Sequence, residues 1–220
     1  MSISLAVPEH EQSRGEEIAN SISHGVGLIA ALAATPFLIA HAVRLGDAEF
    51  IVGARVFAAT MVLLYLASTL YHALPRGKAK RAFQLIEHAA IFLLIAGTYT
   101  PFTLGVLRGA WGWTLFGLVW GLAAIGVLLA VVGGVRRYRV LSVLLYLGMG
   151  WLVVVAIRPL WLSMPLSGLL WLVAGGLAYT VGVAFFAAKR LRYGHFVWHL
   201  FVLAGTACHF IAVLFSAAYL

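Results

Sequence analysis

The sequence predicts an all-α integral membrane protein with seven transmembrane helices, a cytoplasmic N-terminus and a C-terminus outside. Three observations support this prediction: the composition, the lengths of the apolar runs and the placement of basic residues between them. Of 220 residues, 63% are hydrophobic and 10% are charged, and the mean hydropathy is +1.01. A soluble domain of this length is much less apolar, so the chain is expected to lie in a bilayer.

Seven apolar runs have the length of about 18 to 25 residues that a membrane-spanning helix needs. They cover, to within a few residues, 21–45, 51–74, 84–107, 111–132, 139–158, 165–188 and 195–218. They are expected to form a single domain over residues 1–220, with residues 1–17 as a cytoplasmic N-terminal segment. This segment is polar and acidic, so no cleaved leader is expected. No internal repeat is evident, which disfavours a transporter built from inverted repeats.

Individual residues at the ends of the predicted spans, and inside the third span, support the positions and shapes of these helices. Glu16 and Glu17 are expected to solvate the start of the first helix and to interact favourably with its dipole. The second span ends just before Pro75, because proline cannot continue a helix. In the third span, Gly97 and Pro101 are expected to produce a kink. Basic residues follow the fourth and sixth spans, and the seventh span contains three histidines.

Lysine and arginine are distributed unevenly between the two sides of the membrane. Eleven lie at the N-terminus or after an even-numbered span, namely Arg14, Arg76, Lys78, Lys80, Arg81, Arg136, Arg137, Arg139, Lys189, Arg190 and Arg192. The other four are Arg44, Arg55, Arg108 and Arg158. Because cytoplasmic loops are enriched in basic residues, this pattern predicts a cytoplasmic N-terminus. The net charge of +8 therefore reflects topology, and no nucleic-acid partner is expected.

The seventh span carries a polar stripe. His199, Thr206 and His209 follow His195 at offsets of 4, 11 and 14 residues, which all return close to the same helix direction. Histidine is costly in hydrocarbon, so the stripe is expected to face protein. His209 lies deepest and is expected to be a core histidine with satisfied hydrogen bonds.

Three further polar residues are predicted at the depth of the first two histidines of this stripe. Ser68 and His72 share one face at the end of the second span, and Glu87 opens the third span. In the predicted topology, His72, Glu87 and the pair His195 and His199 all lie toward the cytoplasmic side. Three separate segments thus bring three imidazoles and one carboxylate to one level of the membrane.

This set of side chains is typical of a metal site. Histidines at i and i+4 can bind one ion, and a third from a facing helix completes the set found in catalytic zinc sites, with one position open for water. A nearby carboxylate can orient a ligand, bind that water or take its proton. We therefore predict that His72, His195 and His199 bind a metal, with Glu87 beside it. Three imidazoles favour zinc, copper, iron or nickel over magnesium or calcium.

The sequence disfavours two other uses of these histidines, as haem ligands and as a proton or ion pathway. His195 and His209 are 14 residues apart, a spacing at which one helix could ligate two stacked haems, but no partner helix has a matching pair. A proton or ion pathway would place its polar groups at staggered depths, and only Thr98, Thr206 and His209 continue inward. HFVWH also lacks the glutamate of the zinc-protease pattern HExxH.

Four motifs in order resemble the progestin and adipoQ receptor family, in particular its bacterial hemolysin III branch. They are Glu17-x-x-Asn20-x-x-Ser23-His24, Ser68-x-x-x-His72, the segment 87–102 and His195-x-x-x-His199. The resemblance extends from about residue 16 to residue 215. It implies a seven-helix protein of the bacterial inner membrane with a cytoplasmic N-terminus. It also implies zinc bound by His72, His195 and His199, with the third-span acid and Ser68 close by.

The resemblance extends to adiponectin receptors and alkaline-ceramidase-like hydrolases, and so implies zinc-dependent hydrolysis of a membrane lipid amide or ester that adjusts the bilayer. The partner would be a lipid whose acyl chain lies among the helices. Glu87 would act as base or proton shuttle, and Ser68 would bind the water or the developing oxyanion. The family usually has aspartate where Glu87 stands, and the extra methylene could let Glu87 ligate the metal directly.

Two alternative functions stay open. One is a lipid sensor or receptor without enzymatic activity, in which zinc is structural and four protein ligands close its coordination sphere. The other is the channel-forming cytolysin that the family name implies. Seven uninterrupted spans are typical of a resident membrane protein, which speaks against a soluble toxin that inserts into a target.

Overall fold

The computed structural model describes residues 12–188 and 190–217, with only the backbone described at 135 and 136. These residues are almost entirely helical, and no strand occurs among them. The helices form seven spans long and apolar enough to cross a membrane: Arg14–Leu45, Ala48–Ala73, Lys78–Leu107, Gly109–Gly134, Arg139–Ser163, Leu166–Ala187 and Gly194–Ala217. The seven-helix prediction is therefore confirmed, and the chain is a multi-pass membrane protein.

Most spans are single helices and two are interrupted. The elements in order are α1 (Arg14–Leu45), α2 (Ala48–Ala73), α3 (Lys78–Thr100), the π-helix η1 (Pro101–Leu107), α4 (Gly109–Arg137), α5 (Arg139–Trp151), the 3₁₀-helix η2 (Leu152–Ala156), α6 (Ile157–Ser163), α7 (Leu166–Ala187) and α8 (Gly194–Ala217). The third span is thus α3 with η1, and the fifth is α5, η2 and α6 in succession.

Helix α1 begins at Arg14, seven residues before the predicted start at 21. The reason is a capping box: the Ser13 hydroxyl accepts from the backbone N–H of Glu16, and the Glu16 carboxylate accepts from the backbone N–H of Ser13. Of the predicted N-terminal segment 1–17, residues 1–11 lie outside the described residues, as does residue 218 at the predicted end of the last span.

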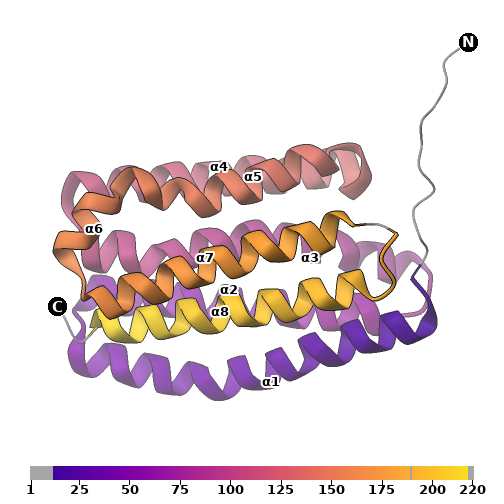
Figure 1. Ribbon diagram of the computed structural model, residues 1–220, viewed down its shortest axis with the longest axis horizontal. Helices are drawn as coiled ribbons and strands as arrows, with labels where there is room; N and C mark the ends of the chain where they lie inside the picture. The colour runs from indigo at the N-terminus through magenta and orange to yellow at the C-terminus, as the bar shows by residue number, and fades with distance from the viewer. Residues whose placement is uncertain (1–11, 189, 218–220) are drawn as a thin grey trace, which may run out of the picture.

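The spans pack as a bundle with helix axes close to one common direction (Figure 1). Helix α1 lies at one edge and contacts α2 and α8, whereas α4 and α5 lie at the opposite edge (Figure 1). The third span is central: 72% of its most apolar window is buried, against 11% for the fifth span. Residues on α3 therefore face protein on most sides, as a polar site requires.

The irregularity expected at Gly97 and Pro101 is a change from α-helix to π-helix at Pro101. Helix α2 approaches this part of the chain closely because Gly53 has no side chain. A Cβ atom at Gly53 would lie only 2.5 Å from Cα of Pro101. This close packing fixes α2 against α3 and η1.

The fifth span is interrupted at η2, and Tyr99 of α3 supports the interruption. The Tyr99 hydroxyl accepts from the backbone N–H of Val153 at 2.8 Å and donates to the carbonyl of Met149, also at 2.8 Å. Backbone groups that leave the α-helical pattern inside a membrane need such partners, because lipid offers none. One buried hydroxyl thus bonds backbone groups just before the interruption and within it.

We expect Tyr99→Phe to destabilise the protein by about 1–3 kcal/mol, because it removes the hydrogen-bond partner of the Val153 backbone N–H inside a membrane span. The measurement is the free energy of unfolding in detergent. Tyr138→Phe, at the C-terminal end of α4, is the matched control. Equal stabilities for Tyr99→Phe and the wild type would show that water or a backbone shift replaces the hydroxyl.

Candidate metal centre

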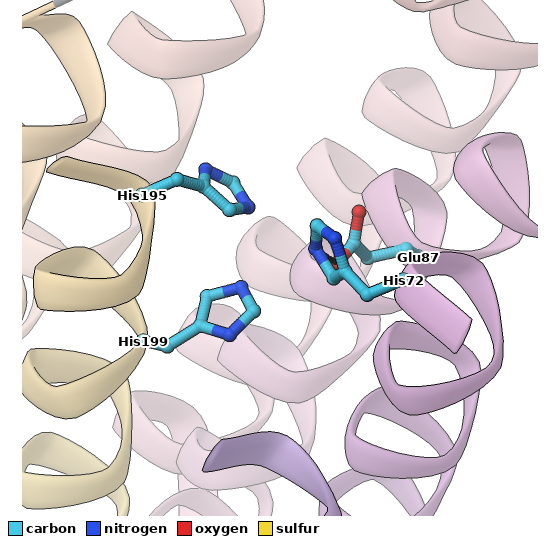
Figure 2. A group of neighbouring side chains, drawn as sticks. All are labelled: His72, Glu87, His195 and His199. Carbon is cyan, nitrogen blue, oxygen red and sulfur yellow. Dashed lines mark ion pairs between the residues drawn. The ribbon is translucent and has the colours of Figure 1, made fainter. Parts of the chain in front are cut away.

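Three helices bring the predicted ligands together at one end of the bundle. His72 lies in the last turn of α2, Glu87 lies on α3, and His195 and His199 lie in the first turns of α8. Each contributes one potential ligand atom, and these atoms all lie within 4.8 Å of one another. Figure 2 shows the two imidazoles of α8 facing His72 and Glu87. These residues could hold a metal ion.

The hydrogen bonding of the cluster fits a cation. The Nε2 atoms of His72 and His195 are buried, and neither has a hydrogen-bond partner among the described residues. Such unpaired nitrogens are costly inside a membrane protein unless something binds them. Three imidazoles and a carboxylate are a donor set typical of zinc and related transition metals.

Glu87 is held by the residue predicted to act with it. The Ser68 hydroxyl, fully buried on α2, donates to Oε1 of Glu87 at 2.5 Å. The same oxygen lies 3.6 Å from Nε2 of His72. In this arrangement Ser68 orients the carboxylate, whereas the resemblance implied a bond from Ser68 to water or to a developing oxyanion.

Helix α1 contributes hydrogen-bond partners for two of the histidines. Oε2 of Glu17 lies 2.8 Å from Nδ1 of His72, and Oε1 of Glu17 lies 3.0 Å from Nζ of Lys80. Nδ1 of His199 lies 3.1 Å from Oγ of Ser23 and 3.2 Å from the carbonyl oxygen of Asn20. The three histidine partners, Glu17, Asn20 and Ser23, all lie on α1, far in sequence from the histidines that they contact.

The expectation that Glu16 and Glu17 solvate the helix start was incomplete. Glu16 is 4% exposed, and its Oε1 accepts from the backbone N–H of Tyr193 at 2.9 Å. Glu17 binds His72 and Lys80 as described above. A signal was present in the sequence: Glu17, Asn20 and His24 recur at helical spacing and so lie on one face of α1.

Three further histidines lie near the site: His88, whose Nδ1 is 3.7 Å from Oε2 of Glu87, and His24 and His209, which differ in their surroundings. The ring of His24 stacks on that of His199, with centroids 3.5 Å apart, and neither of its nitrogens has a partner among the described residues. Nε2 of His209 bonds the carbonyl of Leu172 at 3.2 Å, but its Nδ1 is unpartnered within the described part of the chain. His209 is thus a buried core histidine outside the metal cluster of the described residues, with one of its two ring nitrogens hydrogen-bonded.

A long cavity leads from the cluster into the bundle. Glu87, His195 and His199 line one end, and the rest of its wall is mainly apolar. Phe186 and Leu169 of α7 both line it, and the 17 residues between them span about 25 Å of helix. The cavity volume is about 140 Å³, roughly ten times what a single buried water needs. An apolar chain attached to a polar group fits this shape.

Part of the cavity wall faces the lipid. Val154 of η2, Ile157 of α6 and Val173 of α7 line the cavity and are 53%, 41% and 38% exposed. Because these residues lie within membrane spans, their exposed surface faces acyl chains.

Comparison with known proteins gives a consistent picture. The chain is similar to Hemolysin-3 of Bacillus cereus, with 47% identity over 200 residues that cover 91% of each protein. Its identity with the Hemolysin-3 homolog of Bacillus subtilis (strain 168) is 45% over 200 residues, or 91% of this chain and 93% of the relative. The human Monocyte to macrophage differentiation factor is 28% identical over 212 residues, or 90% and 83% of the two chains.

No solved structure gives a significant match. The family model described as Haemolysin-III related matches residues 12–210, which contain every residue of the metal cluster. This match confirms the resemblance drawn from the four sequence motifs. The chain belongs to the Haemolysin-III related family.

Proposed function

We propose that this protein is a zinc-dependent hydrolase of membrane lipid amides or esters. The observation that carries the proposal is the position of three imidazoles and a carboxylate at one end of an apolar cavity inside a membrane protein. A polar reaction centre would sit where the carbonyl of a lipid can reach it, and the acyl chain would fill the cavity. His72, His195 and His199 would hold the ion.

The roles of the protein groups follow from their positions. Zinc bound there would supply Lewis acidity and lower the pKa of a bound water to about 7. Ser68 holds Oε1 of Glu87. Oε2 of Glu87, which lies 3.7 Å from Nδ1 of His88, would accept a proton from water as the water oxygen adds to the substrate carbonyl. The same proton then passes to the leaving amine or alcohol when its bond to the carbonyl carbon breaks. Products are a fatty acid and an amine or an alcohol.

The test is turnover by purified, zinc-loaded protein in mixed micelles of ceramide, phospholipid or a long-chain acyl amide, with released fatty acid measured by mass spectrometry. The His195→Ala/His199→Ala variant is the control. Fatty acid release by the wild type that the variant lacks would support the proposal. No release from any of the three lipid classes by a zinc-loaded protein would overturn it.

A non-enzymatic lipid sensor with structural zinc is the second candidate. It is favoured by the presence of four potential donors within 4.8 Å, since four protein ligands would leave no position open for water. Two relatives carry the name Hemolysin-3, which adds a channel-forming cytolysin as a third candidate. Leakage of dye-loaded liposomes with the wild type, absent with His72→Ala, would favour the cytolysin.

We also propose that the metal centre faces the cytoplasm of a bacterial cell, in the inner membrane. The cluster lies at the end of the bundle where α1 and α8 begin, and eleven of fifteen basic residues belong to that side. Alkaline phosphatase fused after Leu220 is expected to be active in an Escherichia-type host, and green fluorescent protein at the same position is expected to be dark. The opposite result would place the metal centre outside.

A further inference from the structure

We infer that the first turns of α1 are the positioning element of the metal centre: Glu17 and the Asn20–Ser23 turn fix His72 and His199 with Nε2 as the ligating nitrogen. This inference rests on the proposed metal site, and it concerns residues for which the sequence predicted no part in metal binding. Histidine ligands commonly need an outer hydrogen-bond acceptor that sets the ring orientation and the protonated nitrogen. Two of the ligands find theirs on α1.

The partners of His199 settle which of its nitrogens carries the proton. A backbone carbonyl can only accept, so Nδ1 of His199 donates its hydrogen to the carbonyl oxygen of Asn20 at 3.2 Å. The Ser23 hydroxyl donates to that same carbonyl at 2.9 Å, and its oxygen is then available to the same Nδ1–H at 3.1 Å. Nε2 of His199 is left as a lone-pair donor for a metal.

The partner of His72 has the same consequence. A carboxylate is an acceptor, so Nδ1 of His72 donates to Oε2 of Glu17 at 2.8 Å. Lys80, at the start of α3, holds the other oxygen of Glu17 at 3.0 Å and keeps the carboxylate in place. Nε2 of His72 is buried, has no hydrogen-bond partner among the described residues and faces the cluster, 3.6 Å from Oε1 of Glu87.

Two successive carboxylates of α1 reach two different ligand-bearing helices. Glu17 binds His72 on α2, and Glu16 accepts from the backbone N–H of Tyr193, directly before α8 begins. Neighbouring side chains on a helix point about 100° apart, so one turn of α1 can contact both partners at once. Helix α1 packs against α2 and α8, and this turn therefore sets the separation between His72 and the histidine pair.

The experiment measures zinc affinity by competition with chelators of graded affinity, in detergent-purified protein without a polyhistidine tag. Glu17→Gln keeps the side-chain size but removes the charge that holds His72, and it is expected to weaken zinc binding about 10–100-fold. Ser23→Ala is expected to weaken it by a smaller factor. Glu49→Gln, the same change on the exposed first turn of α2 at the other end of that helix, is the matched control and is expected to bind like wild type.

The thermal midpoint of the metal-free protein separates positioning from folding. We expect the thermal midpoint of each metal-free variant to match that of the metal-free wild type, because the substitutions weaken only the zinc-bound form of the protein. Wild-type zinc affinity in both Glu17→Gln and Ser23→Ala would overturn the inference; if Glu17→Gln fails to fold, Ser23→Ala decides. A wild type that binds no zinc would remove the metal centre itself, whereas unchanged affinity in the variants removes only the role of α1. Because affinity is read without turnover, the result does not depend on lipid hydrolysis.

Discussion

Glu87→Gln should abolish lipid hydrolysis while leaving the metal bound. The substitution preserves size and an acceptor oxygen for Ser68, but an amide cannot take a proton from water. Loss of a positioned general base typically costs a factor of about 10²–10⁴ in rate. We expect turnover to fall by that factor in the zinc-loaded variant, with the fatty acid released measured by mass spectrometry.

Two comparisons make this result interpretable. Ser68→Ala should lower turnover less than Glu87→Gln does, because it loosens the carboxylate without removing it. Glu49→Gln carries the same chemical change on an exposed part of α2 and should retain full activity. If Glu87→Gln loses its zinc, Glu87 is a ligand that closes the coordination sphere, and the structural-zinc sensor becomes the better explanation.

Removing the metal should lower the stability of the wild type strongly. A ligand present at 1,000 times its dissociation constant stabilises the folded state by about 4 kcal/mol. For a chain of this size that corresponds to a shift of the thermal midpoint on the order of 10 °C. Dialysis against a strong chelator should produce this drop, and zinc added back should reverse it.

A variant that lacks two of the proposed ligands should not respond to chelator or zinc, whereas a variant outside the cluster should respond like the wild type. His195→Ala/His199→Ala is expected to have one midpoint regardless of chelator or zinc. His41→Gln serves as control, because its imidazole bonds the carbonyl of Leu214 and belongs to no metal cluster in the described parts of the chain. That control should show the full metal-dependent shift. If the thermal midpoint of the wild type is the same with and without chelator, no bound metal contributes to the stability of the folded state.

The sequence predicted the spans well because hydrophobic length is set by the thickness of the bilayer. Every predicted span overlaps one of the seven helical spans, with differences of up to seven residues at the ends. The grouping of His72, Glu87, His195 and His199 followed from two simple facts: their positions at helix ends and the alternating direction of the spans. Neither fact needs knowledge of side-chain packing.

Other features could not be read from the sequence because they depend on contacts between distant segments. Glu17 and His72 are 55 residues apart, and the helical spacing that places Glu17, Asn20 and His24 on one face of α1 does not show that this face meets His72. The interruption of the fifth span at η2 is supported by Tyr99, which is 54 residues before Val153. The long cavity likewise depends on residues from several helices.

The most direct test of the central claim is the metal content of protein purified without a metal-affinity tag, measured by inductively coupled plasma mass spectrometry. The wild type is compared with His195→Ala/His199→Ala, prepared in the same way. We predict about one zinc ion per chain in the wild type and almost none in the variant. Absence of zinc and other transition metals from the wild type, or equal zinc in both proteins, would contradict the assignment of these histidines as ligands.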